Sequence, residues 1–212
     1  MIILKIVMVL FYSLMIYTNY YANTKPLGGI STGEISDKYS TLFTPAGFTF
    51  SIWGVIYLLV GSFVIISIAN NRYFSSNNTL VIYLFILSCV INGAWLFAWH
   101  YDKILLSTII MIAFLVVLLL ILKNIQEADK IGYITFSVYS GWVSVALIAN
   151  ISILITKYDL SIFMNYQWFW FILILIVGVG IMTTMFIKTS NYIYGLVFVW
   201  AYFGILMKFI QK

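Results

Sequence analysis

Apolar residues fill seven long runs of the chain, and short polar segments separate these runs. A helix needs roughly 20 mostly apolar residues to cross the hydrocarbon core of a bilayer, and each run is about that long. The pattern predicts seven transmembrane helices in an all-α polytopic bundle. They leave no room for a separate soluble domain, so residues 1–212 are expected to form a single membrane domain. The predicted spans are Ile2–Ala22, Ala46–Asn70, Thr79–His100, Ile104–Leu122, Ile131–Thr156, Gln167–Ile187 and Asn191–Ile210.

The composition agrees with the membrane interpretation and excludes several other classes. Charged residues make up only 8% of the chain and the mean hydropathy is +1.08, whereas a soluble domain carries about 25% charged residues. One cysteine excludes a disulfide scaffold. The net charge of +5 does not indicate nucleic-acid binding, because the eleven Lys and Arg residues are scattered singly. Such isolated loop cations are typical of membrane proteins, so the bilayer is the expected partner.

The first run has an alternative interpretation as a cleaved signal peptide. The apolar core of a signal peptide is only about 7–15 residues long, whereas Ile2–Ala22 approaches the length of a span. We therefore expect a retained helix. The orientation is left open, because Lys and Arg residues number five on one predicted face and six on the other. The odd helix count places the C-terminus on the same side as the first loop.

That first loop, Asn23–Thr44, is the longest and differs in composition from the others. It contains three glycines and also Glu34, Asp37 and Lys38. Long loops inside compact proteins often act as lids or binding loops. We expect this loop to cover a site.

Aromatic and amide side chains follow one stripe in three of the predicted helices. Residues spaced by three or four, and then by seven or eight, lie on one side of a helix. Because successive helices alternate in direction, all three stripes fall in the half of the membrane near the first loop. The stripes are Phe50, Trp53 and Tyr57; Asn92, Trp95 and Trp99; and Trp142, Ala146 and Asn150.

These side chains have structural as well as functional interpretations. Tryptophan is common at membrane interfaces, so Trp99, Trp168 and Trp170, near helix ends, are expected to be interfacial anchors. The deeper Trp53, Trp95 and Trp142 are expected in a pocket or core. Asn92 and Asn150 should face the bundle interior, where their amides either join helices or contact a ligand. Glycines 54, 61, 141, 178 and 180 are expected at close helix contacts.

The sequence offers little catalytic chemistry. No Asp or Glu lies within any predicted span, which disfavours proton-coupled transport. The single histidine, His100, stands beside Tyr101 and Asp102. It could ligate haem iron or transfer a proton, but such a group is more often a solvated helix end. We predict no catalytic residues and no metal site.

Three segments that carry the aromatic stripes resemble the TspO/MBR family, also called tryptophan-rich sensory or translocator proteins. They correspond to the family's Pro-Pro-Gly-Trp-x-Phe…Trp…Tyr, Asn-x-x-Trp and Tyr-x-x-Trp-x-x-x-Ala-x-x-x-Asn patterns. Ala46 and Phe48 depart from the first pattern, which indicates a divergent branch. The resemblance covers residues 1–156, and residues 167–210 are two additional helices. The segments are Pro45–Phe50 with Trp53 and Tyr57, Asn92–Phe97, and Tyr139–Asn150.

The resemblance implies a five-helix unit with a ligand cavity beneath the first loop. The implied ligand is a flat hydrophobic molecule, either a porphyrin or haem, or a sterol-like compound, and the protein would act as a sensor or carrier. A homodimer in a bacterial plasma membrane is also implied. The alternatives are a transporter for a hydrophobic compound without ion coupling, or a porphyrin-modifying enzyme that uses Trp142 or His100. The implied ligand-binding residues are Pro45, Phe50, Trp53, Tyr57, Asn92, Trp95, Trp142, Ala146 and Asn150.

Overall fold

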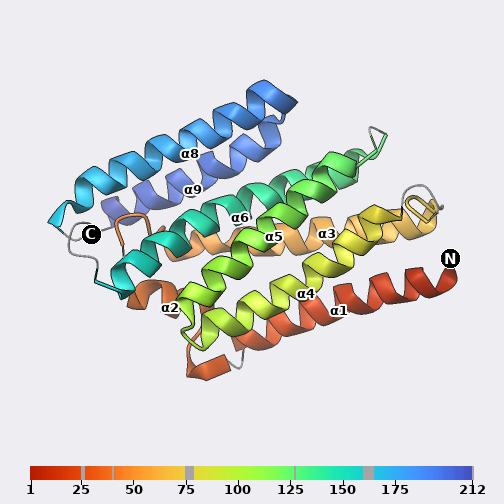
Figure 1. Cartoon of the computed structure of the whole chain (residues 1–212), viewed down its shortest axis with the longest axis horizontal. Coiled ribbons are helices and arrows are strands. Elements are labelled where there is room, and N and C mark those ends of the chain that lie inside the picture. Colours follow the sequence, from red (N-terminus) through yellow and green to blue (C-terminus); the bar gives the residue numbers. More distant parts are fainter. Residues whose placement is uncertain (25–26, 40, 75–78, 127, 160–164, 212) are drawn as a thin grey trace.

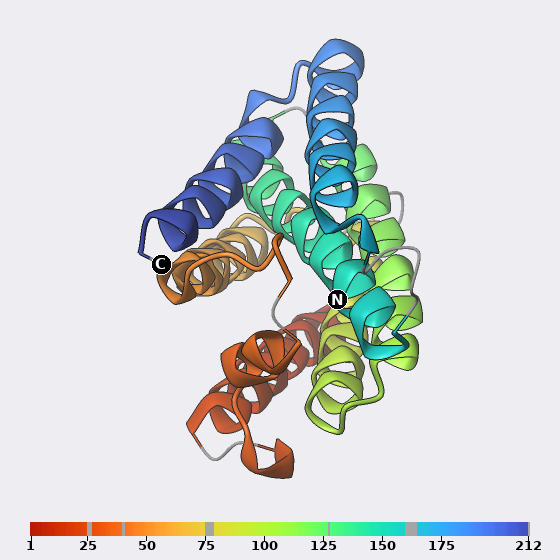
Figure 2. The same ribbon diagram turned by 90° about the vertical axis from the view of Figure 1, so that its left-hand side faces the viewer.

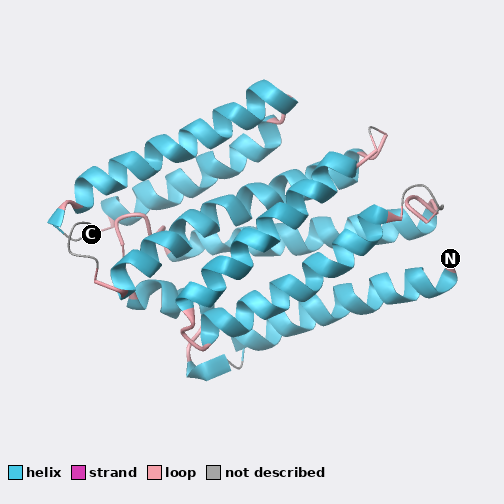
Figure 3. Ribbon diagram, viewed as in Figure 1, coloured by secondary structure: helices cyan, strands magenta, loops and turns pink. Residues whose placement is uncertain are grey.

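A computed structural model describes residues 1–24, 27–39, 41–74, 79–126, 128–159 and 165–211. Over these ranges the chain is helical and contains no strand (Figures 1 and 3). Seven helices are long and apolar enough to span a membrane, which confirms the predicted all-α bundle. The spanning helices are α1 (Ile2–Thr24), α3 (Ile52–Ala69), α4 (Leu80–His100), α5 (Ile104–Asn124), α6 (Lys130–Lys157), α8 (Gln167–Thr189) and α9 (Tyr192–Ile210).

The long first loop is folded into short helical pieces. They are η1 (Leu27–Gly29), α2 (Thr32–Lys38) and η2 (Gly47–Ser51), which leads directly into α3. A capping box starts α2, because the Ser31 side chain accepts a hydrogen bond from the Glu34 N–H and the Glu34 carboxylate accepts one from Ser31 N. Residues 27–39 and 41–51 are called the lid below.

Helix α6 is the centre of the bundle and packs against α3, α5 and α9. The end-on view shows α6 between the α8–α9 pair and α1 (Figure 2). A Cβ atom added at Gly141 would lie 3.1 Å from both the Tyr194 carbonyl oxygen and Val197 Cβ. The missing side chain therefore lets α9 approach α6 closely.

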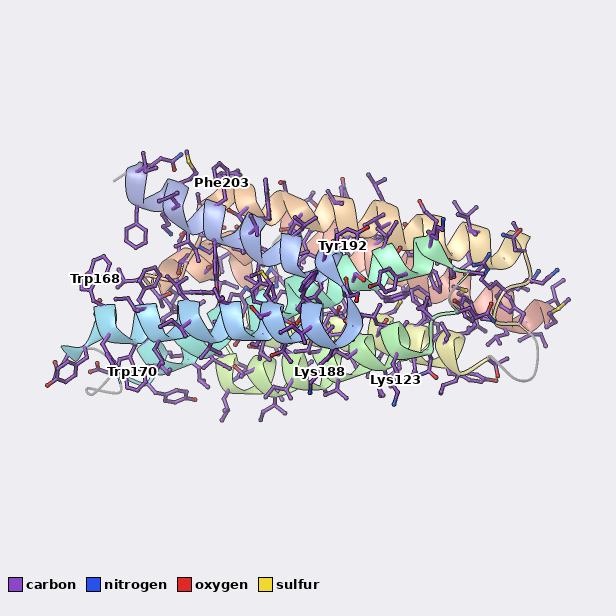
Figure 4. All side chains as sticks on the ribbon, turned by 90° about the horizontal axis from the view of Figure 1, so that it is seen from above. Lys123, Trp168, Trp170, Lys188, Tyr192 and Phe203 are labelled. Atoms are coloured by element: carbon purple, nitrogen blue, oxygen red, sulfur yellow. The ribbon has the colours of Figure 1, made fainter. Side chains whose placement is uncertain are left out.

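Helix α8 lies at the edge of the bundle and packs mainly on α9. Gly178 is its single buried residue within the described chain, where it meets the Tyr202 side chain. Trp168 and Trp170 mark the N-terminal end of α8, opposite Lys188 (Figure 4). Trp168 is 62% exposed, which suits the predicted place at a membrane interface.

The lid and the C-terminus lie at the same end of the molecule, and the N-terminus lies at the other (Figure 1). Lys208 Nζ of α9 pairs with Asp37 Oδ1 of the lid at 3.2 Å. At the opposite end, Asp129 caps α6 and accepts a hydrogen bond from Tyr73 OH at 2.8 Å. Arg72 pairs with the same carboxylate at 3.3 Å, so the α3–α4 turn is tied to the start of α6.

Candidate functional site

A small cavity of about 40 Å³ lies beneath the lid, among α4, α6 and α9. Seven of the nine residues singled out from the sequence line it: Pro45, Phe50, Trp53, Trp95, Trp142, Ala146 and Asn150. Helix direction and the three stripes therefore brought most of the expected residues to one place.

Tryptophan rings form the main wall of this cavity. Trp53 stacks on Trp95 with ring centroids 6.1 Å apart, and Trp95 stacks on Trp99 at 5.9 Å. Trp142 meets Trp53 edge to face, at 6.3 Å and 89°. Such pairs add about 0.5–1.5 kcal/mol each beyond burial, so the ring contacts stabilise this wall.

Two of these indoles have an unpaired N–H group. Trp95 and Trp142 are 5% and 2% exposed, and neither Nε1 has an acceptor among the described residues. An unpaired buried donor costs about 1–3 kcal/mol. Other indoles near the lid are paired, because Trp99 donates to the Thr32 carbonyl at 3.2 Å and Trp200 to the Thr49 carbonyl at 3.0 Å. Two residues that line the cavity therefore carry an N–H donor without an acceptor among the described residues.

Trp99 was expected at the membrane interface, and this expectation is wrong. The residue is buried, lines the cavity and bonds to the lid, because α2 covers the end of α4. His100 is also buried and is not a solvated helix end. Its Nδ1 lies 2.9 Å from the Leu96 carbonyl and its Nε2 lies 3.4 Å from Thr32 Oγ1. The described residues contain no group of three metal-binding side chains.

Tyr57 and Asn92 lie outside the cavity lining, in a polar network between helices. Tyr57 OH donates to Asn19 Oδ1 at 2.7 Å, and Asn19 Nδ2 donates to Asn92 Oδ1 at 2.6 Å. Asn92 Nδ2 in turn donates to Tyr139 OH at 3.2 Å. These bonds connect α1, α3, α4 and α6. Both residues thus join helices. Asn19 was not singled out from the sequence, although it is an amide in the first predicted span with Tyr12 seven residues before it.

Asn150 lines the cavity and also joins two helices. Its Oδ1 accepts hydrogen bonds from Thr108 Oγ1 at 2.6 Å and Ser107 Oγ at 3.2 Å, both on α5. Its Nδ2 donates to Ser107 Oγ at 3.1 Å. The amide is therefore well satisfied by protein groups, in contrast to the two indoles.

Asp102, in the turn between α4 and α5, holds the lid in place. It pairs with Lys38 at 2.9 Å and Lys157 at 3.0 Å, and it accepts a hydrogen bond from Tyr39 OH at 2.8 Å. Partial burial raises the pKa of Asp102, but the hydrogen bonds from Lys38, Lys157 and Tyr39 outweigh it and hold the pKa below its usual value. The same contact raises the pKa of Lys38.

The C-terminal helix also contributes to the site. Ala201 and Ile205 of α9 line the cavity, and Ala46 N donates to the Gly204 carbonyl at 3.0 Å. Phe43 of the lid closes the cavity and is buried. The apolar sequence of α9 gave no sign of this role, since the contact depends on how α9 packs on α6.

Comparison with protein families matches residues 5–212 to the TSPO-like protein family. The match extends through α8 and α9, beyond the residues 1–156 that carry the sequence resemblance. No curated protein and no solved structure matches the chain. The family match over nearly the whole chain, together with the seven apolar helices, shows that this protein belongs to the TSPO-like family of integral multi-pass membrane proteins.

Proposed function

We propose that this protein binds a flat aromatic ligand with hydrogen-bond acceptors in the tryptophan-lined cavity, and that it acts as a sensor or carrier of that ligand. Porphyrin or haem is the proposed class. The observation that carries the proposal is the pair of unpaired indole N–H groups, on Trp95 and Trp142, in one cavity wall. Carboxylate or carbonyl oxygens on the ligand would remove the cost of these donors, while the rings supply a stacking surface.

The chemistry of the wall favours a tetrapyrrole over a sterol-like ligand. A sterol has no flat π-system to stack on Trp53 or Trp142, and its one hydroxyl is a single polar group, whereas a tetrapyrrole combines a flat ring with separate carboxylates. The asparagine in the wall adds no free amide, because Asn150 is already bonded to α5. Recognition is therefore assigned to the indoles.

The cavity in its present form does not hold a tetrapyrrole macrocycle. Its volume of about 40 Å³ is far below the roughly 300–1,000 Å³ of ligand pockets. Ligand binding thus requires the lid to move away from α4 and α9. Two of the contacts that hold α2 are ion pairs near the surface, Lys38–Asp102 and Lys208–Asp37, and such pairs contribute little to holding α2 in place. The buried contacts of Ile35 and Ser36 must also be broken for α2 to move.

The experiment is a titration of the purified full-length protein in nanodiscs with protoporphyrin IX and with haem, followed by tryptophan quenching and difference absorbance. Trp95→Phe and Trp142→Phe keep an aromatic ring but remove the N–H donor. Each should weaken binding by up to about tenfold, the effect of one hydrogen bond. Trp168→Phe, on the exposed end of α8, is the matched control and should bind normally.

Equal affinity in all three variants would contradict the proposal and leave the indole cluster as packing. An absence of saturable binding by the unmodified protein would contradict it as well. A change confined to Trp95→Phe and Trp142→Phe supports it.

A further inference from the structure

A second and larger cavity, of about 340 Å³, lies between α6 and α8, with lid residues at one end. It is called the α6–α8 groove below. Its volume falls within the roughly 300–1,000 Å³ typical of ligand pockets. Its walls are almost entirely hydrocarbon, and the main residues are Ile148, Ile151 and Ile155 of α6 and Leu173, Ile174 and Val177 of α8.

The groove follows from the way α8 joins the bundle. Helix α8 packs on α9 rather than on α6, so its inward face and the second half of α6 stand apart. Leu173 and Val177 are part of the groove wall and are also partly exposed. The groove is therefore continuous with the lipid-facing surface of α8.

The groove has the depth of one membrane leaflet. Gln167 lies at its lid end and Val177 lies ten residues further along α8, which corresponds to about 15 Å of helix. The hydrocarbon core is about 30 Å thick, so this is half of it. The polar members of the lining gather toward the lid end, where Thr41, Thr156 and Gln167 lie at the level expected for headgroups.

The change from a polar lining at the lid end to an apolar lining deeper in the groove indicates what kind of molecule fits it. Water is unstable in an apolar cavity, and an empty one forfeits van der Waals contacts, whereas lipid chains surround this groove on its open side. We propose that the α6–α8 groove binds the hydrocarbon chain of one membrane amphiphile, with its hydrogen-bonding headgroup beside Thr41, Thr156 and Gln167. The site lies outside the tryptophan cavity and does not depend on tetrapyrrole binding.

Phe43 connects the groove with the cavity beneath the lid. Its buried ring lines both spaces, so this side chain is part of the wall between them, together with α6. An amphiphile in the groove therefore packs against the same residue that closes the tryptophan cavity.

The test uses the full-length protein in phosphatidylcholine vesicles with a diazirine-bearing fatty acid as the probe. After photolysis, mass spectrometry maps the labelled residues. Saturable labelling is expected in the second half of α6 and the first half of α8, and excess palmitic acid should compete for it.

Ile174→Trp fills the groove and should reduce this saturable labelling by about tenfold. Ile176→Trp is the matched control on the same helix, at a position that is 61% exposed and outside the groove lining. It should label like the unmodified protein. Leu173→Trp at the mouth of the groove needs no buried space and is the second blocking variant. Non-saturable labelling spread over every lipid-facing helix, or unchanged labelling in both blocking variants, would overturn the proposal.

Discussion

Lys38 Nζ lies 2.9 Å from Asp102 Oδ2, and this ion pair joins the lid helix α2 to the turn between α4 and α5. Asp102 also holds Lys157 of α6, so one carboxylate connects the lid with the bundle beneath it. The proposed ligand needs the lid to move, and we expect the charge of Asp102 to affect that movement.

Acidification should loosen the lid. The pKa of Asp102 is lowered in the folded protein, so its stabilising contribution is complete above the ordinary aspartate value. That contribution is lost as the pH falls through the lowered folded value, below about pH 4. Hydrogen exchange of the α2 amides, corrected for intrinsic rates, should therefore rise between about pH 6 and about pH 3.

Asp102→Asn should raise the same exchange at neutral pH and remove the part of its pH dependence that comes from Asp102, leaving the part that comes from the Glu34 cap of α2. The effect should be several-fold at most, because the carboxylate is partly exposed and screened. Asp159→Asn makes the same charge change outside the lid and should leave α2 unaffected. If neither acid nor Asp102→Asn changes the hydrogen exchange of α2, contacts other than those of Asp102 hold the lid.

Asn19→Ala should destabilise the bundle more than Asn23→Ala does. The substitution leaves the Tyr57 hydroxyl and the Asn92 amide without their buried partner. The expected loss is about 1–3 kcal/mol, measured as a lower midpoint of thermal unfolding in detergent. Asn23→Ala is the control, because the Asn23 amide bonds only within α1. Equal midpoints for the two variants would show that the interhelical network contributes nothing measurable.

Gly141→Val should push α9 away from α6. The added side chain has no room between the Tyr194 carbonyl and Val197, and overpacking of this kind costs about 1–3 kcal/mol. Gly54→Val meets no neighbour within 4 Å and is the matched control. The measurement is the rate of crosslinking between cysteines placed on α6 and α9. Equal rates in both variants would contradict close packing at Gly141.

Phe43→Ala should open the wall between the α6–α8 groove and the tryptophan cavity. The photoreactive fatty acid should then also label Trp53, Trp142 or their immediate neighbours, which line the tryptophan cavity and not the groove. Phe48→Ala removes a half-exposed lid ring that packs on Trp200 and should not change the labelling pattern. Labelling that stays confined to the groove in Phe43→Ala would mean that other lid residues also close the cavity.

The sequence alone determined the seven spans, the relative side of the lid and the C-terminus, and most of the cavity wall. Membrane spans are set by the length and composition of local apolar runs, so no long-range contact is needed to predict them. Spacing along single helices likewise put Trp53, Trp95 and Trp142 on stripes at a common depth, and the structure brings these stripes together.

Tertiary structure decided what depends on contact between distant segments. The sequence placed five glycines at close helix contacts, yet only Gly61, Gly141 and Gly178 meet a neighbour, while Gly54 and Gly180 face open space. Trp99 is buried because α2 folds over it. Asn92 forms a hydrogen bond with Asn19 and does not line the cavity. The α6–α8 groove forms because α8 packs on α9 and leaves a space between itself and α6. The sequence of an apolar helix does not show which neighbouring helix it packs against, because nearly every face of such a helix can contact either lipid or protein.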